Sequence, residues 1–170
     1  MATLQTDIAA NQQPGANFPG GADGLTPQPG GFNDPVYELG SASVVTATYT
    51  MTGNEAVNDV IQIVLLGMGA IVSPESTVAN DGAATTLTIQ VGDTDTVGGT
   101  VSADPKRYSD SVSVAAATTT VPTPFTGGTT VAAPAEITDD PVWVQAKILT
   151  VGTPVAGKVL VFRLRLTDNR

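Results

Sequence analysis

The C-terminal part of the sequence, residues 142–168, alternates apolar and other side chains with a period of two. In its second half the large apolar residues fall on every other position: Leu160, Phe162, Leu164 and Leu166. Successive side chains of a strand point to opposite faces, so these four share one face of a strand. The first half repeats the pattern over residues 142–149, and turn residues separate the halves: Gly152, Pro154 and Gly157. We therefore expect a long antiparallel hairpin with one dry face, and a second layer that covers it.

The rest of the chain also reads as short strands separated by turns. Alternating or continuously apolar runs occur at residues 44–51, 58–66, 70–72, 85–91 and 112–114, with weaker ones near 119–121 and 129–132. The run 58–66 is almost wholly apolar, which is typical of a central strand covered on both sides. About eight strands with turns every 8–12 residues predict an all-β fold, an antiparallel sandwich or barrel.

Two absences limit the chemistry that this chain can perform. It contains no Cys, which excludes disulfides, thiolate metal sites and Cys nucleophiles. It contains no His, the commonest metal ligand and general base. We expect no enzyme activity and no cofactor, and we regard a hydrolase as the least favoured class.

The charge is acidic and unevenly distributed. Net charge is −9, and no Lys or Arg precedes Lys106. Phosphate contacts need clustered basic residues, so a nucleic-acid partner is not expected. The longest apolar run, residues 61–72, is too short to span a bilayer, and the N-terminus lacks the pattern of a secretory signal. We therefore expect no membrane partner.

Residues 1–40 differ from the rest in being rich in Gly, Pro, Asn and Gln, with isolated large apolar residues. Such a composition cannot bury enough surface to offset the cost of ordering the backbone, about 1–2 kcal/mol per residue. One interpretation is a disordered tail. The other, which we favour, is an extended arm that orders against a partner through separate anchors: Phe18, Phe32 and Tyr37. Residues 41–170 would then form the body.

Acidic and glycine-rich motifs are candidate sites for a metal ion, acid–base chemistry or a phosphate group. Four carboxylates could supply oxygen ligands for calcium: Asp93, Asp95, Asp104 and Asp110. The spacing is unspecific, so we expect a solvated turn and no metal. Asp139–Asp140 reads as a turn, and Gly98–Gly99 lacks the Lys and helix of a phosphate loop.

Basic residues suggest two possible contact surfaces. The cluster Lys106–Tyr108 could bind an acidic partner, but a loop-to-strand transition with Tyr108 packed is the more common arrangement. Arg163 and Arg165 share the outer face of the last strand with Val161. That face is either a subunit interface, where Arg is favoured, or an ordinary solvated surface.

The order of these parts resembles the small jelly-roll structural proteins of tailed bacteriophages. The segments that carry the resemblance are NDVIQIVLLGMGAIV, LTIQVGDTDT, DPKRYSDSVSVAA, VWVQAKILTV and GKVLVFRLRL, within residues 41–168. The resemblance implies a jelly-roll sandwich that acts as a capsid decoration or cement protein. It would form a homotrimer on the capsid surface of the virion and bridge major capsid protein subunits. The alternative within the same class is a head or tail fibre protein that binds a receptor such as a carbohydrate.

Overall fold

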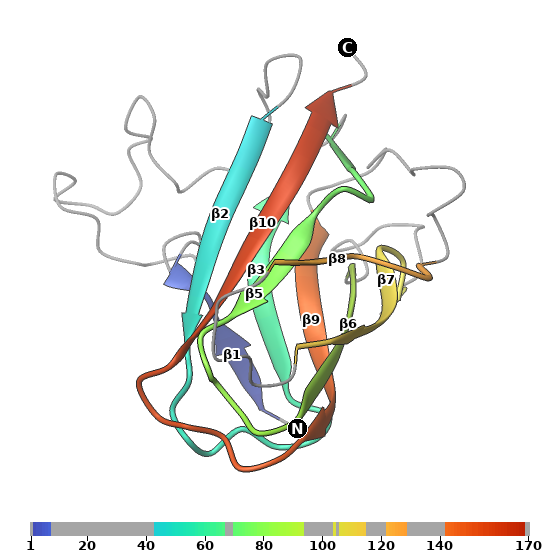
Figure 1. The fold of residues 1–170 in the computed structure, drawn as a ribbon. Coiled ribbons are helices and arrows are strands. Elements are labelled where there is room, and N and C mark those ends of the chain that lie inside the picture. Colours follow the sequence, from blue (N-terminus) through green and yellow to red (C-terminus); the bar gives the residue numbers. More distant parts are fainter. Residues whose placement is uncertain are drawn as a thin grey trace, which may run out of the picture.

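The computed structural model describes residues 2–7, 43–66, 70–93, 104, 106–114, 122–128 and 142–168. Ten strands of these residues form two sheets that face each other (Figure 1). The predicted all-β sandwich is therefore confirmed. Among the described residues, no helix has the length and apolar character needed to cross a membrane.

The first sheet has the strand order β1-β3-β9-β6-β7. Its strands are β1 (Thr3–Gln5), β3 (Val60–Leu66), β9 (Val142–Val151), β6 (Leu87–Asp93) and β7 (Ser109–Ser113). All neighbours in it are antiparallel except β1 and β3, which run parallel. A parallel pair needs a long connection between its strands. Here the chain passes through the other sheet between β1 and β3.

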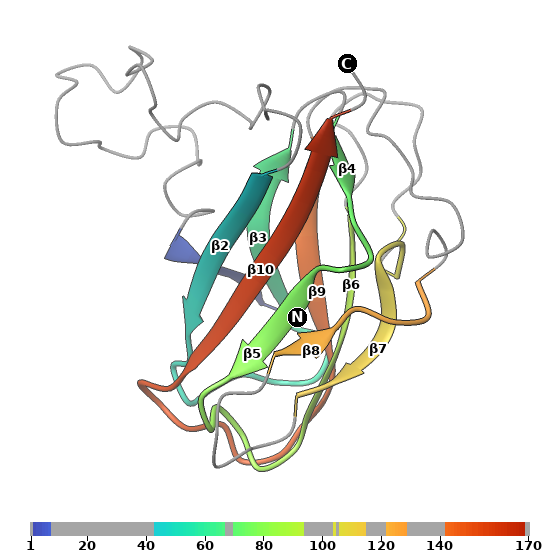
Figure 2. The same cartoon turned by 45° about the horizontal axis from the view of Figure 1, so that its top comes forward.

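The second sheet has the order β2-β10-β5-β8, and β4 also pairs with β10. Its strands are β2 (Ser43–Thr50), β10 (Val159–Asp168), β5 (Thr77–Asn80), β8 (Thr123–Pro124) and β4 (Ala70–Val72). β4 pairs with the end of β10 and β5 with its beginning, so both flank the side of β10 that faces away from β2. Figure 2 shows β10 in the middle of this layer.

The core lies between the two layers and is built from the inward-facing residues of both. The alternating residues of β10 are fully buried, and so are Val144, Ala146 and Ile148 of β9. Phe162 is the largest of the fully buried side chains. Full burial of such a side chain stabilises the fold by about 1.5–3 kcal/mol. The predicted inner faces of both terminal strands are confirmed.

The expected terminal hairpin is wrong. β9 pairs with β3 and β6 in the first sheet, whereas β10 pairs with β2, β4 and β5 in the second. The connection 152–158 crosses from one layer to the other, and its Pro154 bridges to Ala84. The physical reason is burial: in a hairpin both dry faces would lie on the same side of one sheet and would need a second layer to cover them. In opposite layers, β9 and β10 cover each other.

β3 contains a bulge that explains its nearly continuous apolar sequence. Its register with β9 shifts between Gln62 and Val64, so Ile63 is an extra residue. Ile61 and Ile63 point inward before the shift, and Val64 and Leu66 point inward after it; all four are fully buried. A bulge places one additional residue in a strand and thereby changes the phase of the alternation.

Some expected features differ from the structure or lie outside the described residues. The strand β1 was not expected, because residues 1–40 carry no strand pattern. Residues 8–42, which hold most of the predicted arm, are outside the described part, as are the weak strands predicted at 119–121 and 129–132. A two-residue strand, β8, lies between those two positions. The division into arm and body otherwise stays a prediction.

Candidate docking surface

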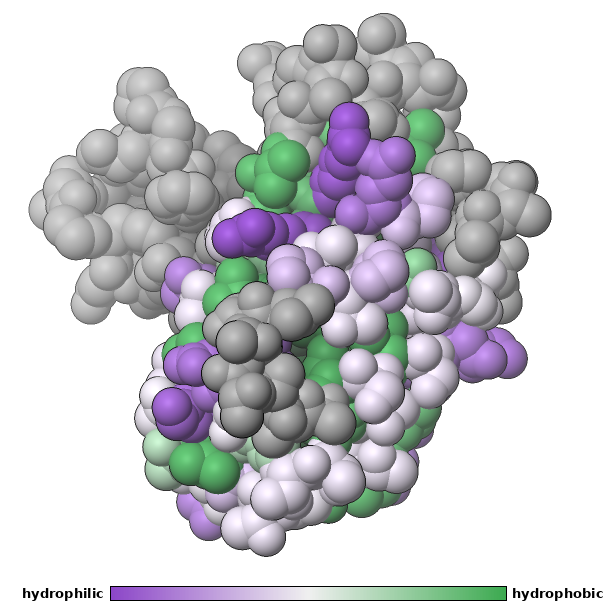
Figure 3. Space-filling model, viewed as in Figure 1, coloured by the Kyte–Doolittle hydropathy of each residue, from purple (hydrophilic) through white to green (hydrophobic). Residues whose placement is uncertain are grey.

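The outer face of the second sheet carries the two arginines identified in the sequence. Arg163 lies between Thr46 of β2 and Thr77 of β5, and Arg165 lies beside Val44. Both arginines and Thr46 are exposed. Val44 is 64% exposed, which is high for a valine in a strand. In Figure 3 hydrophilic side chains gather over the upper part of β10, with a hydrophobic group on the β2 side.

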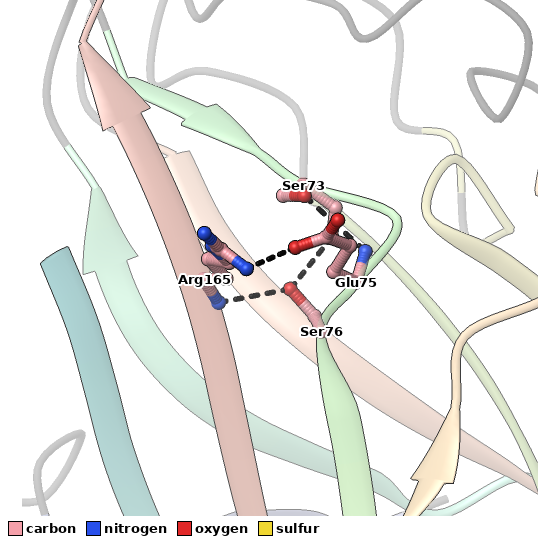
Figure 4. A network of polar contacts seen from close by, with 4 residues as sticks. All are labelled: Ser73, Glu75, Ser76 and Arg165. Carbon is pink, nitrogen blue, oxygen red and sulfur yellow. Dashed lines mark hydrogen bonds and ion pairs between the residues drawn. The ribbon is translucent and has the colours of Figure 1, made fainter. Parts of the chain in front are cut away.

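Arg165 has an acidic partner within its own chain. Its guanidinium pairs with the carboxylate of Glu75 in the turn between β4 and β5 (Figure 4). The backbone N–H of Arg165 donates to the hydroxyl of Ser76 at 3.0 Å, and its carbonyl accepts from the N–H of Ser73 at 2.8 Å. The two charged side chains are about half exposed, at 52% and 64%. A pair this exposed contributes about 0–1 kcal/mol, so it positions Arg165 more than it stabilises the fold.

Arg163 differs from Arg165 in its surroundings. Within the described residues no acidic side chain lies within ion-pair distance of Arg163. Its neighbours across the strands are the uncharged Thr46 and Thr77. An exposed guanidinium without a local counterion is free to form charge-assisted bonds with a second molecule. The strand position that the sequence assigned to Arg163 and Arg165 is thus observed; their contact with a partner stays a prediction.

The other predicted contact residues, Phe18, Phe32 and Tyr37, lie outside the described residues. Most aromatic side chains that the structure does describe are buried: Tyr49, Tyr108, Phe125 and Phe162. Trp143 on β9 is partly buried. The described body therefore presents no fully exposed aromatic ring, the platform on which a sugar would stack.

The acidic segment around Asp93 is a buried ion pair, which corrects the expectation of a solvated turn. Asp93 is 3% exposed, and its carboxylate lies 2.5 Å from Nε of Arg107. The same carboxylate accepts bonds from the hydroxyl of Tyr108 at 3.0 Å and the N–H of Asp104 at 3.3 Å. Burial raises the pKa of Asp93, and the Arg107 guanidinium opposes that rise. Tyr108 is packed, as the more common interpretation of the Lys106–Tyr108 cluster predicted.

This arrangement anchors a loop. Arg107 pairs with the Asp93 carboxylate that calcium would need, and Asp110 is exposed. No group of three or more potential metal ligands occurs among the described residues. Asp95, the Gly98–Gly99 pair and the Asp139–Asp140 pair lie outside the described part.

Two buried carboxylates in the connection between β2 and β3 were not identified from the sequence. Glu55 accepts bonds from the hydroxyl of Tyr49 at 2.7 Å, the N–H of Thr52 at 2.5 Å and the N–H of Gly53 at 3.0 Å. Burial by itself raises the pKa of Glu55, but these bonds outweigh it and hold the pKa below its ordinary value. The Thr-x-x-Glu spacing was the available signal, because a Glu three residues after a Thr can bond back to it.

Asp59 is the second of these carboxylates. Its two oxygens accept bonds from the N–H groups of Ala2 at 2.6 Å and Ala56 at 2.9 Å. These bonds, that from Ala2 first, lower the pKa of Asp59. The bond from Ala2 joins residues 57 positions apart, and no local sequence pattern indicates it.

Comparison of the whole fold with solved structures gives two matches. A chain of the capsid of Ralstonia phage GP4 superposes with a TM-score of 0.61 at 20% identity, covering 99% of both chains. A chain of the capsid asymmetric unit of cyanophage Pam1 superposes with a TM-score of 0.52 at 22% identity, covering 89% of this chain and all of that one. The body is a jelly roll. No protein-family model and no curated protein matches the sequence.

In this jelly roll the candidate docking surface is the outer face of the second sheet. Arg163 lies on β10, which pairs along both of its edges, and Val44 lies on β2, which pairs with β10. The surface combines an exposed apolar side chain, threonines and a guanidinium. Such a mixture suits contact with another protein surface better than it suits catalysis.

Proposed function

We propose that this protein is a structural component of a bacteriophage virion. The observation that carries the proposal is the match of nearly the whole chain to a chain of a phage capsid, at 99% coverage of both. Fold alone does not determine function. The chemistry of the chain supports the same class, because it lacks His and Cys and the described residues form no metal-ligand group. We accordingly assign it no enzymatic activity.

Within that class we propose a capsid decoration or cement protein that forms homotrimers. Its work is burial of surface across neighbouring major capsid protein subunits, which opposes the outward pressure of the packaged genome. Three linked copies bind together far more tightly than one, because the second and third contacts form within one assembly. A modest interface on each jelly roll is then sufficient.

Two sets of residues would make the contacts. In residues 8–42, Phe18, Phe32 and Tyr37 are well-spaced anchors, each able to fill a separate pocket. On the outer face of the second sheet, Arg163 and Arg165 would face acidic groups of a neighbour. Every charged side chain before Lys106 is acidic, so a neighbouring copy carries suitable partners in its own N-terminal region.

The test is binding of purified protein to capsids assembled without it, from the phage that encodes it. Replacement of Phe18, Phe32 and Tyr37 together by Ala should weaken binding at least about tenfold, because buried aromatic anchors dominate interface energies. The matched control is Val155→Ala, which removes a 40%-exposed apolar side chain from the body. Unchanged binding of the triple variant would move the docking site to the jelly roll. Absence of binding by the unmodified protein would contradict the cement function itself.

A further inference from the structure

Residues 2–7 occupy a specific site along the edge of β3. The parallel pairing places Thr3 beside Val60, Leu4 beside Ile61 and Gln5 beside Gln62. Leu4 packs against the core, and the side-chain amide of Gln5 donates to that of Gln62 at 3.0 Å. The segment thus binds the edge of β3 through backbone pairing, an apolar contact and a side-chain hydrogen bond.

Both ends of the segment are held as well. Ala2 donates its N–H to the buried carboxylate of Asp59, and the N–H of Val60 donates back to the carbonyl of Ala2 at 2.9 Å. At the other end the hydroxyl of Thr6, which is 1% exposed, donates to the carbonyl of the bulged residue Ile63 at 2.6 Å. Thr6 therefore supplies a hydrogen-bond donor to the carbonyl of the bulged residue.

The last residue of the segment reaches the other sheet. The carboxylate of Asp7 accepts a bond from the N–H of Thr48 at 2.7 Å. β2 is the end strand of its sheet, and Met51 directs its N–H toward the β10 side, to Lys158. Backbone groups of a strand alternate in direction, so the Thr48 N–H faces the free edge. Asp7 caps that edge.

An empty site would be costly. Without residues 2–7, the Asp59 carboxylate, the Val60 N–H and the Gln62 and Ile63 carbonyls would each lose a bond that the segment supplies. A buried polar group left without its partner costs about 1–3 kcal/mol. Occupation of the edge of β3 therefore stabilises the fold, and the same bonds form whether the occupant belongs to the same copy or to another.

The length of the connection favours another copy. Asp7 lies against Thr48, five residues along β2 from Ser43, a separation of about 17 Å. About six extended residues would close that distance, yet residues 8–42 supply 35. Fully extended, 35 residues reach about 115 Å. The connection is several times longer than closure within one copy requires.

We propose that the edge of β3 is a strand-acceptor site, and that in the assembled protein it binds residues 2–7 of a second copy. The exchange preserves every contact described above, so it costs little, and it ties the copies together. It goes beyond the capsid function proposed above, and its test involves no capsid. The two proposals can fail separately. A protein that binds capsids without exchanging strands would contradict only the exchange, and a strand-exchanged assembly that binds no capsid would contradict only the cement function.

The absence of Cys makes a disulfide test clean. Two single variants, Gln5→Cys and Gln62→Cys, are co-expressed with one of them carrying a larger tag, and then oxidised. Neighbouring strands lie about 4.8 Å apart, within the Cα separation that a disulfide accepts. Exchange predicts a covalent dimer of mixed size. The matched control pairs Gln5→Cys with Gln145→Cys, one strand further along the same row, which should give no dimer.

Absence of the mixed dimer, with a disulfide closed inside single chains of the double variant Gln5→Cys/Gln62→Cys, would overturn the proposal. A second measurement needs no disulfide. Deletion of residues 10–36 leaves eight connecting residues, which reach about 26 Å and still close within one copy. Tagged and untagged assemblies of this variant should exchange subunits at least about tenfold faster than those of the unmodified protein. In the variant, residues 2–7 do not have to be withdrawn from the β3 edge of another copy before a subunit dissociates. Equal rates would also overturn the proposal.

Discussion

At the scale of single residues, the buried carboxylates among the described residues hold loop backbone and side chains in place. Glu55 and Asp59 collect backbone N–H groups at the connection between β2 and β3, and Asp93 pairs with Arg107 at the end of β6. Each carboxylate has partners for both of its oxygens. Buried charge is tolerated only under that condition.

Asp59→Asn should lower the free energy of unfolding by about 1–3 kcal/mol. The two Asp59 oxygens accept one N–H each, whereas an amide would turn its own NH₂ group toward one of those donors. Urea unfolding at neutral pH measures the effect. The control is Asp81→Asn, since Asp81 is exposed and only 4.0 Å from Lys158 in a loose ion pair. Equal stability of the two variants would contradict the assigned role.

The fold should lose stability in acid. The pKa values of Glu55 and Asp59 are held below their ordinary 4.5 and 3.8, so folding favours their ionised forms. Their contribution is complete above these values and disappears as the pH falls through the lowered pKa values of the folded state. Burial shifts the pKa of Asp93 upward from its ordinary 3.8. Protonation of Asp93 just above pH 3.8 therefore favours the folded state, which opposes the loss of stability caused by Glu55 and Asp59.

We therefore expect the free energy of unfolding to fall between pH 5 and pH 3, with the variant Glu55→Gln/Asp59→Asn losing less than the unmodified protein. Urea titrations at several pH values measure both slopes. A stability that stays level or rises over this interval would show that Asp93 dominates.

At the scale of elements, β10 combines two tasks on its two faces. Its inner side chains fill the core, while Arg163 and Arg165 stand on the outside. Because it pairs on both sides, with β2 and with β4 and β5, its outer face is a rigid platform.

Neighbouring positions of β10 should respond oppositely to truncation. Phe162→Ala should cost about 3–5 kcal/mol, since Phe162 is fully buried and the cavity cannot fully collapse. Arg163→Ala should change stability by less than about 0.5 kcal/mol because the side chain is exposed. Thermal and urea unfolding of both variants provide the comparison. A large loss of stability in Arg163→Ala would assign it a structural role instead.

The bulge of β3 and the segment 2–7 depend on each other. Thr6→Val keeps the shape of the side chain and removes the hydroxyl that satisfies the Ile63 carbonyl. The expected loss is about 1–3 kcal/mol, measured by urea unfolding. Thr46→Val on the exposed face of β2 is the control, and an equally large loss there would remove the argument for the bulge.

At the scale of the whole molecule, the proposed function requires the jelly roll to bind other copies of the protein and the capsid. Arg163→Glu should weaken association of the protein with itself or with capsids, and the loss should shrink at high salt, because exposed charges are screened. Sedimentation at micromolar concentration and capsid binding at two salt concentrations measure this. Lys158→Glu, at the base of β10, is the control. A strictly monomeric unmodified protein would contradict the trimer.

Much of this architecture was accessible from the sequence. Period-two alternation identified the inner faces of β9 and β10, because successive side chains of a strand point to opposite faces of the sheet. The absence of His and Cys limited the chemistry. Composition predicts that residues 1–40 form a separate arm, which stays a prediction, and it could not reveal β1, whose three residues are too few for any period.

Pairing partners were decided only by the tertiary structure. Alternation states which face of a strand is buried and says nothing of which strand lies beside it, so β9 and β10 could be neighbours in one sheet or opposite each other across the core. The structure has the second arrangement, in which both dry faces are buried. The same holds for Asp59 and Ala2, and for Asp93 and Arg107. Their contacts join distant positions, and only the folded chain brings them within bonding distance.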